Sequence, residues 1–166
     1  MTEGWAQRKG PAKRTSPTVL SMRSEAAGSI SVSFAAAPDG ARLTGSAAQG
    51  TLDLGTASFA GGAFTPNVSV QKLSGRFVVS TRFTMTLQDA SQRVNTATVT
   101  AALALPEPLF ILRLDGVKLG PVPQMIQGQA KLGATSSHRL EIEVPSSVTE
   151  KNSQLQNAIV FQVIAN

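Results

Sequence analysis

One segment of the sequence alternates between mainly apolar and mainly polar residues over an unusual length, from residue 76 to residue 88. The side chains expected on its apolar face are Phe77, Val79, Thr81, Phe83, Met85 and Leu87. A period of two is the spacing of side chains on one face of a β-strand. The segment therefore predicts a long strand with one buried face, and the rest of the chain must supply a second layer to cover that face.

The same period recurs along much of the chain after residue 28. Apolar and polar residues alternate in 30–34, 68–71, 96–105 and 140–144, and turn sequences such as Asp115-Gly116 separate these segments. Residues 158–164 are almost all apolar, which predicts a central strand buried on both faces. Pro121 and Pro123 exclude a central strand at their positions, so residues 125–132 are expected at a sheet edge.

These segments amount to roughly nine or ten short strands with no convincing helical period between them. The chain has 166 residues and 42% apolar residues, which is enough for one domain with a real core. We therefore predict an all-β fold, an antiparallel β-sandwich of the jelly-roll or immunoglobulin-like type. The predicted organisation is an extended arm over residues 1–24 and a sandwich domain over residues 25–166.

The predicted arm holds most of the chain's excess positive charge, which is +5 in total. Its basic residues include Arg8, Lys9, Lys13 and Arg14. Such an arm can contact an anionic polymer or surface, such as nucleic acid, a cell-wall polymer or an anionic membrane, or it can be a solvated tail. Nothing in the sequence decides between these two interpretations.

The arm also carries a short apolar patch formed by Val19, Leu20 and Met22. The patch has strand character, but no neighbouring segment of the sequence is an obvious partner. A lone strand is not stable in water, so it must stay disordered or pair with something. We predict that residues 1–24 lie outside the subunit's own core and that this patch pairs with a neighbouring subunit.

The residue inventory excludes several kinds of chemistry. The chain has no cysteine and a single histidine, His138, which excludes disulfide scaffolds, zinc fingers and thiol nucleophiles. One histidine needs an aspartate and a nucleophile placed by the fold to form a triad, and the sequence indicates neither. We therefore expect His138 at the surface and predict that the protein is not an enzyme, with no cofactor, metal or small-molecule substrate.

Two weaker patterns favour structural interpretations. Ser69 and Lys72 match the S-x-x-K string of serine acyltransferases, but on a strand they point to opposite faces. Glu141 and Glu143 share a face with Arg139, which is typical of a solvated outer surface. A second set of acidic residues lies in or near predicted turns, where calcium sites of extracellular β proteins occur, and calcium binding stays open. These residues are Asp53, Asp89 and Asp115.

The strand pattern and the segment Leu155-Gln156-Asn157-Ala158-Ile159-Val160-Phe161 resemble secreted bacterial β-sandwich fibre subunits in general terms. The chain departs from chaperone–usher pilins, which typically carry a disulfide and a penultimate tyrosine. The general resemblance implies a non-enzymatic structural or surface protein. Such a protein is expected to form a homo-oligomer or a filament by strand donation.

Two alternatives remain open on sequence alone. One is a monomeric extracellular binding module for a glycan or a protein, and the other is a virion protein whose basic arm meets nucleic acid. We expect an extracellular or bacterial cell-surface location for the structural protein, because the chain is rich in Ser and Thr and poor in Lys, Glu and His. No stretch is long and apolar enough to predict a membrane span. The segment Gly4-Trp5-Ala6 resembles the end of a signal peptide that would begin upstream.

Overall fold

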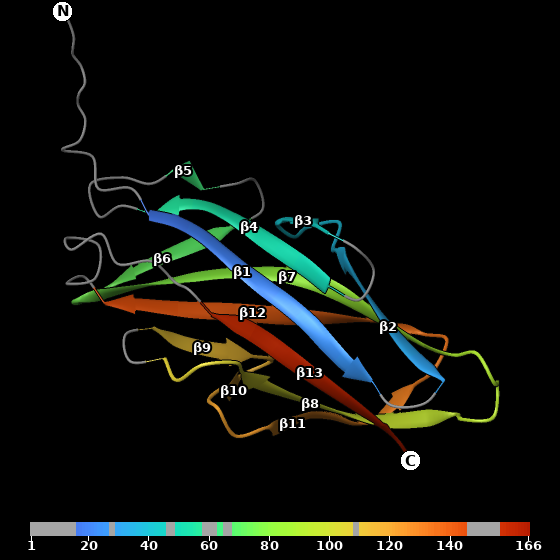
Figure 1. Cartoon of the computed structure of the whole chain (residues 1–166). Helices are drawn as coiled ribbons and strands as arrows, with labels where there is room; N and C mark the ends of the chain where they lie inside the picture. Colours follow the sequence, from blue (N-terminus) through green and yellow to red (C-terminus); the bar gives the residue numbers. More distant parts are fainter. Residues whose placement is uncertain are drawn as a thin grey trace, which may run out of the picture.

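The computed structural model describes the backbone of residues 16–26, 29–45, 49–57, 63–64, 68–107, 110–145 and 157–166. It describes their side chains apart from those of residues 16–19, 26, 53–57 and 63–64. These residues form thirteen β-strands in two sheets that lie face to face (Figure 1). The predicted β-sandwich is therefore confirmed. Within the described ranges, no helix has the length and apolar character needed to cross a membrane.

The two sheets are built from strands that are far apart in the sequence (Figure 1). The seven-stranded sheet contains, in order, β11 (Gln124–Lys131), β8 (Thr96–Leu103), β13 (Ala158–Ala165), β1 (Ser16–Ala26), β4 (Gln49–Ala57) and β3 (Arg42–Thr44), with β5 (Ala63–Phe64) beside β4. The six-stranded sheet contains, in order, β10 (Val117–Lys118), β9 (Ile111–Leu114), β12 (Thr135–Pro145), β7 (Arg76–Asp89) and β2 (Ile30–Ala36), with β6 (Ser69–Leu73) beside β7.

Strand β7 is the segment whose alternation dominates the sequence, and it is an interior strand of its sheet. It pairs with β12 on one side and with β2 and β6 in succession on the other. All six residues of its predicted apolar face are buried. Thr81 is tolerated there because its hydroxyl accepts a hydrogen bond from the Ala41 N–H at 2.8 Å.

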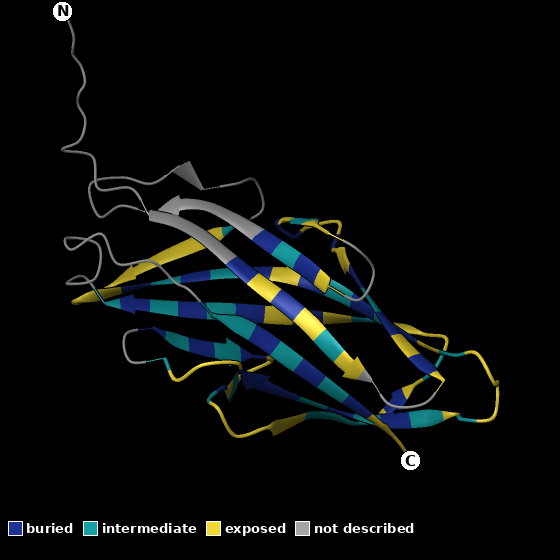
Figure 2. Ribbon diagram, in the orientation of Figure 1, coloured by how far each residue is buried: buried dark blue, intermediate teal, exposed yellow. Residues whose placement is uncertain are grey.

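The core lies between the two sheets, and buried residues alternate with exposed ones along most strands (Figure 2). An aromatic cluster crosses from one sheet to the other. Phe161 on β13 lies 5.3 Å from Phe34 on β2 and 6.2 Å from Phe83 on β7, measured between ring centroids. These tilted and edge-on contacts join the two layers at the centre of the sandwich.

The predicted hairpin turn at Asp115-Gly116 is confirmed. It joins β9 to β10, and both residues have positive φ angles, 51° for Asp115 and 84° for Gly116. Two successive positive φ angles are the signature of a type I′ turn, which suits an aspartate followed by a glycine. The predicted edge strand is confirmed as β11, which ends one side of the seven-stranded sheet.

Three sequence-based expectations need correction. The described residues hold more strands than expected, because β3 and β5 are too short to leave a pattern and β1 was assigned to the arm. Residues 158–164 form a central strand that is buried on one face only, because side chains such as Val160 lie on the outer surface. Leu105 was expected inside but is 58% exposed, because β8 ends at Leu103.

Candidate functional site

Strand β1 is inserted in the middle of the seven-stranded sheet, between β13 and β4 (Figure 1). It pairs with β4 in antiparallel register, with Leu20 opposite Leu52. It pairs with β13 in parallel register, with Arg23 opposite Val160, whereas the other described pairings are antiparallel. We refer to the space between β13 and β4 as the β1 slot.

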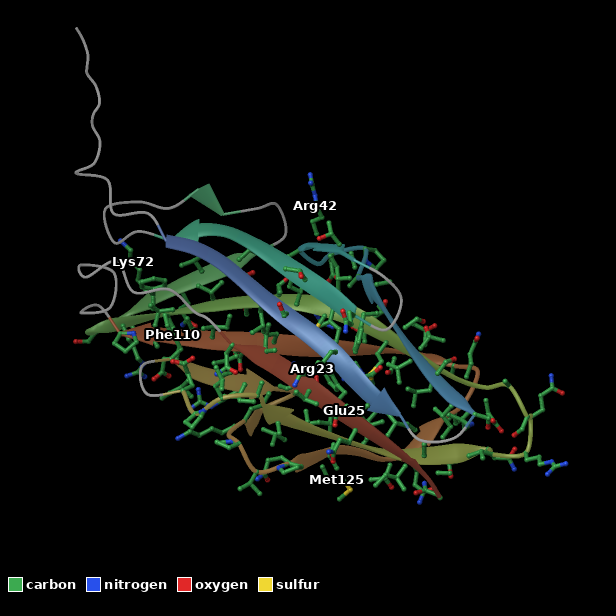
Figure 3. The ribbon with its side chains drawn as sticks, viewed as in Figure 1. Arg23, Glu25, Arg42, Lys72, Phe110 and Met125 are labelled. Atoms are coloured by element: carbon green, nitrogen blue, oxygen red, sulfur yellow. The ribbon has the colours of Figure 1, made fainter. Side chains whose placement is uncertain are left out.

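The side chains of β1 divide cleanly between the core and the outer surface. Leu20 and Met22 are 0% and 1% exposed, and both belong to the core that the two sheets share. Ser21, Arg23 and Glu25 are exposed on the other face, where Arg23 and Glu25 can be followed along the strand in Figure 3. The β1 slot therefore holds a strand by two backbone ladders and by two fully buried side chains.

This arrangement corrects the prediction that residues 1–24 lie outside the subunit's own core. That prediction is wrong for Leu20 and Met22, and the predicted boundary after residue 24 falls inside β1. The partners of β1 are distant in sequence, with Met22 opposite Ile159, so no local pattern could reveal them. The backbone of Val19 pairs opposite Asp53, while its side chain lies outside the described residues.

The basic residues of the predicted arm also lie outside the described residues. They are Arg8, Lys9, Lys13 and Arg14. Their contact with an anionic partner therefore stays a prediction.

A second feature is a chain of hydrogen bonds that joins Ser136, His138 and Asp115. His138 lies on β12, and its side chain is 1% exposed and stacks on Phe83 at 5.6 Å between ring centroids. Its Nδ1 lies 2.7 Å from Asp115 Oδ2, and its Nε2 lies 2.7 Å from Ser136 Oγ. The expectation that His138 lies at the surface is wrong, and Asp115 accompanies it although the sequence indicated no such aspartate.

Local structure explains how these three side chains meet. Ser136 and His138 are two residues apart on β12, so they share its inner face. The type I′ turn directs Asp115 back toward β12, where its Oδ1 accepts a hydrogen bond from the Arg139 N–H at 2.8 Å. A Ser-x-His pair on an alternating strand was visible in the sequence, but its proximity to the Asp-Gly turn depends on the pairing of β9 with β12.

The electrostatics of this cluster favour an ionised aspartate. Burial of Asp115 acts to raise its pKa, but the hydrogen bonds from His138 and Arg139 act in the opposite direction. The charges of His138 and Arg82 add to the second effect, so the pKa of Asp115 lies below its usual value.

Hydrogen bonds within the protein explain the position of Asp89, one of the acidic residues considered for calcium binding. Its carboxylate accepts hydrogen bonds from the Ser29 and Ser91 hydroxyls and from the N–H groups of Arg93 and Val94, each of these backbone bonds being 2.8 Å long. These donors hold the pKa of Asp89 far below its usual value, the Ser29 hydroxyl contributing most. The described residues hold no group of three or more metal-ligating side chains, including those around Asp89.

The glutamates of β12 occupy the outer face, as predicted. Glu141 pairs with Arg139 at 3.3 Å, and Glu143 lies 3.5 Å from both Arg76 and Arg113. The two Glu143 pairs connect β12 with β7 and β9, whereas the Arg139–Glu141 pair lies within β12. These partly exposed ion pairs account for both carboxylates.

The S-x-x-K string also has the predicted structural explanation. Ser69 is opposite Ser80 and Lys72 is opposite Phe77, which places the two side chains on different faces of β6.

Comparisons with known proteins assign no function to the β1 slot or to the Ser136–His138–Asp115 cluster. The chain matches no known protein family. It also matches no curated protein.

Proposed function

We propose that this protein is a non-enzymatic structural subunit of the bacterial cell surface or extracellular space, which assembles by exchanging β1 between copies. The observation that carries this proposal is the β1 slot, in which an inserted first strand completes the core. The same slot can accept Ser16–Ala26 from its own chain or from a second copy.

Exchange preserves the contacts of β1. Leu20 and Met22 would fill the same core positions, and both backbone ladders would form in the same register. Only the connection to β2 has to change, and it consists of residues 27–29, which link strands of opposite sheets. A short connection favours strand exchange when folding back within one chain strains it, because the connection can then extend toward a second copy.

Two kinds of assembly follow from the geometry. Reciprocal exchange between two copies closes a dimer, whereas donation of β1 to the next copy continues head to tail and builds a filament. The composition, rich in Ser and Thr and poor in Lys, Glu and His, supports the extracellular location. Contact of Arg8, Lys9, Lys13 and Arg14 with an anionic polymer is part of this proposal.

The test uses the absence of cysteine to report which copy supplies β1. Arg23→Cys and Val160→Cys are placed on two separate chains, because these positions face each other across β1 and β13. Neighbouring strands lie about 4.8 Å apart, which is within the range that a disulfide spans. The two variants are unfolded together in urea, refolded at high concentration, oxidised and separated on a non-reducing gel.

We expect a covalent dimer that contains one chain of each variant. Mixing Arg23→Cys with Ile164→Cys is the matched control, because that position lies about 13 Å further along the same face and cannot be bridged. The double variant Arg23→Cys/Val160→Cys in a single chain shows that the bond can form. If the double variant closes within one chain and the mixture gives no mixed dimer, exchange is ruled out and a monomeric binding module becomes the better proposal.

A further inference from the structure

The hydrogen-bond geometry of the Ser136–His138–Asp115 cluster selects one tautomer of the neutral form of His138. A carboxylate can only accept, and Asp115 is ionised, so His138 Nδ1 carries the proton that bonds it. When the imidazole carries only this proton, Nε2 keeps a free lone pair and lies 2.7 Å from Ser136 Oγ. In that tautomer Ser136 donates its hydroxyl proton to His138.

The members of the cluster differ in exposure. The imidazole is 1% exposed and stacked on Phe83, whereas the Asp115 side chain is 33% exposed. Ser136 is only partly buried, so part of this residue is open to solvent. The other acceptor near Ser136 Oγ is the Met85 carbonyl at 3.3 Å, a longer and weaker contact than the one to His138.

We propose that Ser136 is an activated nucleophile and a site of covalent modification by activated acyl or organophosphorus esters. In the reaction with a fluorophosphonate, Ser136 Oγ forms a bond to phosphorus while the phosphorus–fluorine bond breaks and fluoride leaves. The hydroxyl proton passes to His138 Nε2, which acts as the general base. Asp115 is a positioning residue that fixes the tautomer of His138. This proposal is independent of β1 exchange.

The experiment treats the native protein with a fluorophosphonate probe and maps the modified residue by mass spectrometry. Ser137 is the internal control, because it is the next residue of β12 and faces the outer surface. We expect Ser136 to react at least about tenfold faster than Ser137, since a positioned general base typically contributes roughly 10²–10⁴-fold. The preference should disappear when the protein is unfolded in urea.

Three variants separate activation from a purely structural role. Asp115→Asn and His138→Gln should reduce labelling of Ser136, and Ser136→Ala should abolish it at this position. Far-UV circular dichroism establishes which variants remain folded. If a variant does not fold, the labelling of Ser136 relative to Ser137 in the native wild-type protein tests the proposal instead. Equal labelling of Ser136 and Ser137 in the native protein would overturn the proposal and leave the cluster as a tie between a turn and a strand.

Discussion

At the scale of single residues, hydrogen bonds explain why a polar histidine can lie inside this core. His138 satisfies both ring nitrogens with hydrogen bonds, to Asp115 and to Ser136, and its ring packs on Phe83. A buried polar group without such partners would cost several kcal/mol, on the order of 2–7 by transfer data. An inner-face position on a strand can therefore hold a polar residue when the fold supplies hydrogen-bond partners for it.

The central aromatic residue gives the first prediction. Phe83 is fully buried and contacts Phe34, Phe161 and His138, so Phe83→Ala should lower the free energy of unfolding by about 3–5 kcal/mol. Urea unfolding measures this change. Val122→Ala is the control, because Val122 is 68% exposed and its truncation should change stability little. A loss below about 1 kcal/mol for Phe83→Ala would contradict the central position of this ring.

At the scale of elements, hydrogen bonds in the connections add to the ladders that hold the strands in place. Asp89 ends β7 and binds the β7–β8 loop through the Arg93 and Val94 N–H groups. It also accepts a hydrogen bond from Ser29, in the connection between β1 and β2. One carboxylate therefore joins the loop after β7 to the segment that β1 exchange would have to rearrange.

This link predicts a defined pH dependence. The folded state lowers the pKa of Asp89, so its stabilising effect is fully present above the pKa of the unfolded chain, about 4, and is lost as the pH falls below it. Asp89→Asn should therefore reduce stability at pH 6, and its difference from the wild type should shrink toward pH 3. Urea unfolding at several pH values checks this, and a difference independent of pH would contradict it.

At the scale of the whole molecule, β1 decides whether the seven-stranded sheet is continuous. Without β1, β13 and β4 have no shared neighbour, and the core loses Leu20 and Met22. This reverses the expectation that the sandwich is complete without residues 1–24. A sandwich of this size is stable by only about 5–15 kcal/mol, so the loss of a central strand affects most of that stability.

Deletion of residues 1–26 should therefore give a chain that does not fold stably. Two buried side chains of this size alone are worth roughly 2–5 kcal/mol each. A synthetic peptide of residues 16–26 should restore the cooperative thermal transition seen by circular dichroism. A peptide with Leu20→Asp should not restore it, because it would bury an unpaired charge. A fully stable deleted chain would contradict this account of the β1 slot.

The sequence by itself determined the local features of this fold. The alternation in residues 76–88 identified the buried face of β7, and the Asp-Gly dipeptide identified the β9–β10 turn, because both depend on residues adjacent in the chain. Only the tertiary structure decided the partners of β1 and the meeting of Ser136, His138 and Asp115. These contacts depend on which distant strands pair, and the spacing of side chains along one strand carries no information about its neighbour.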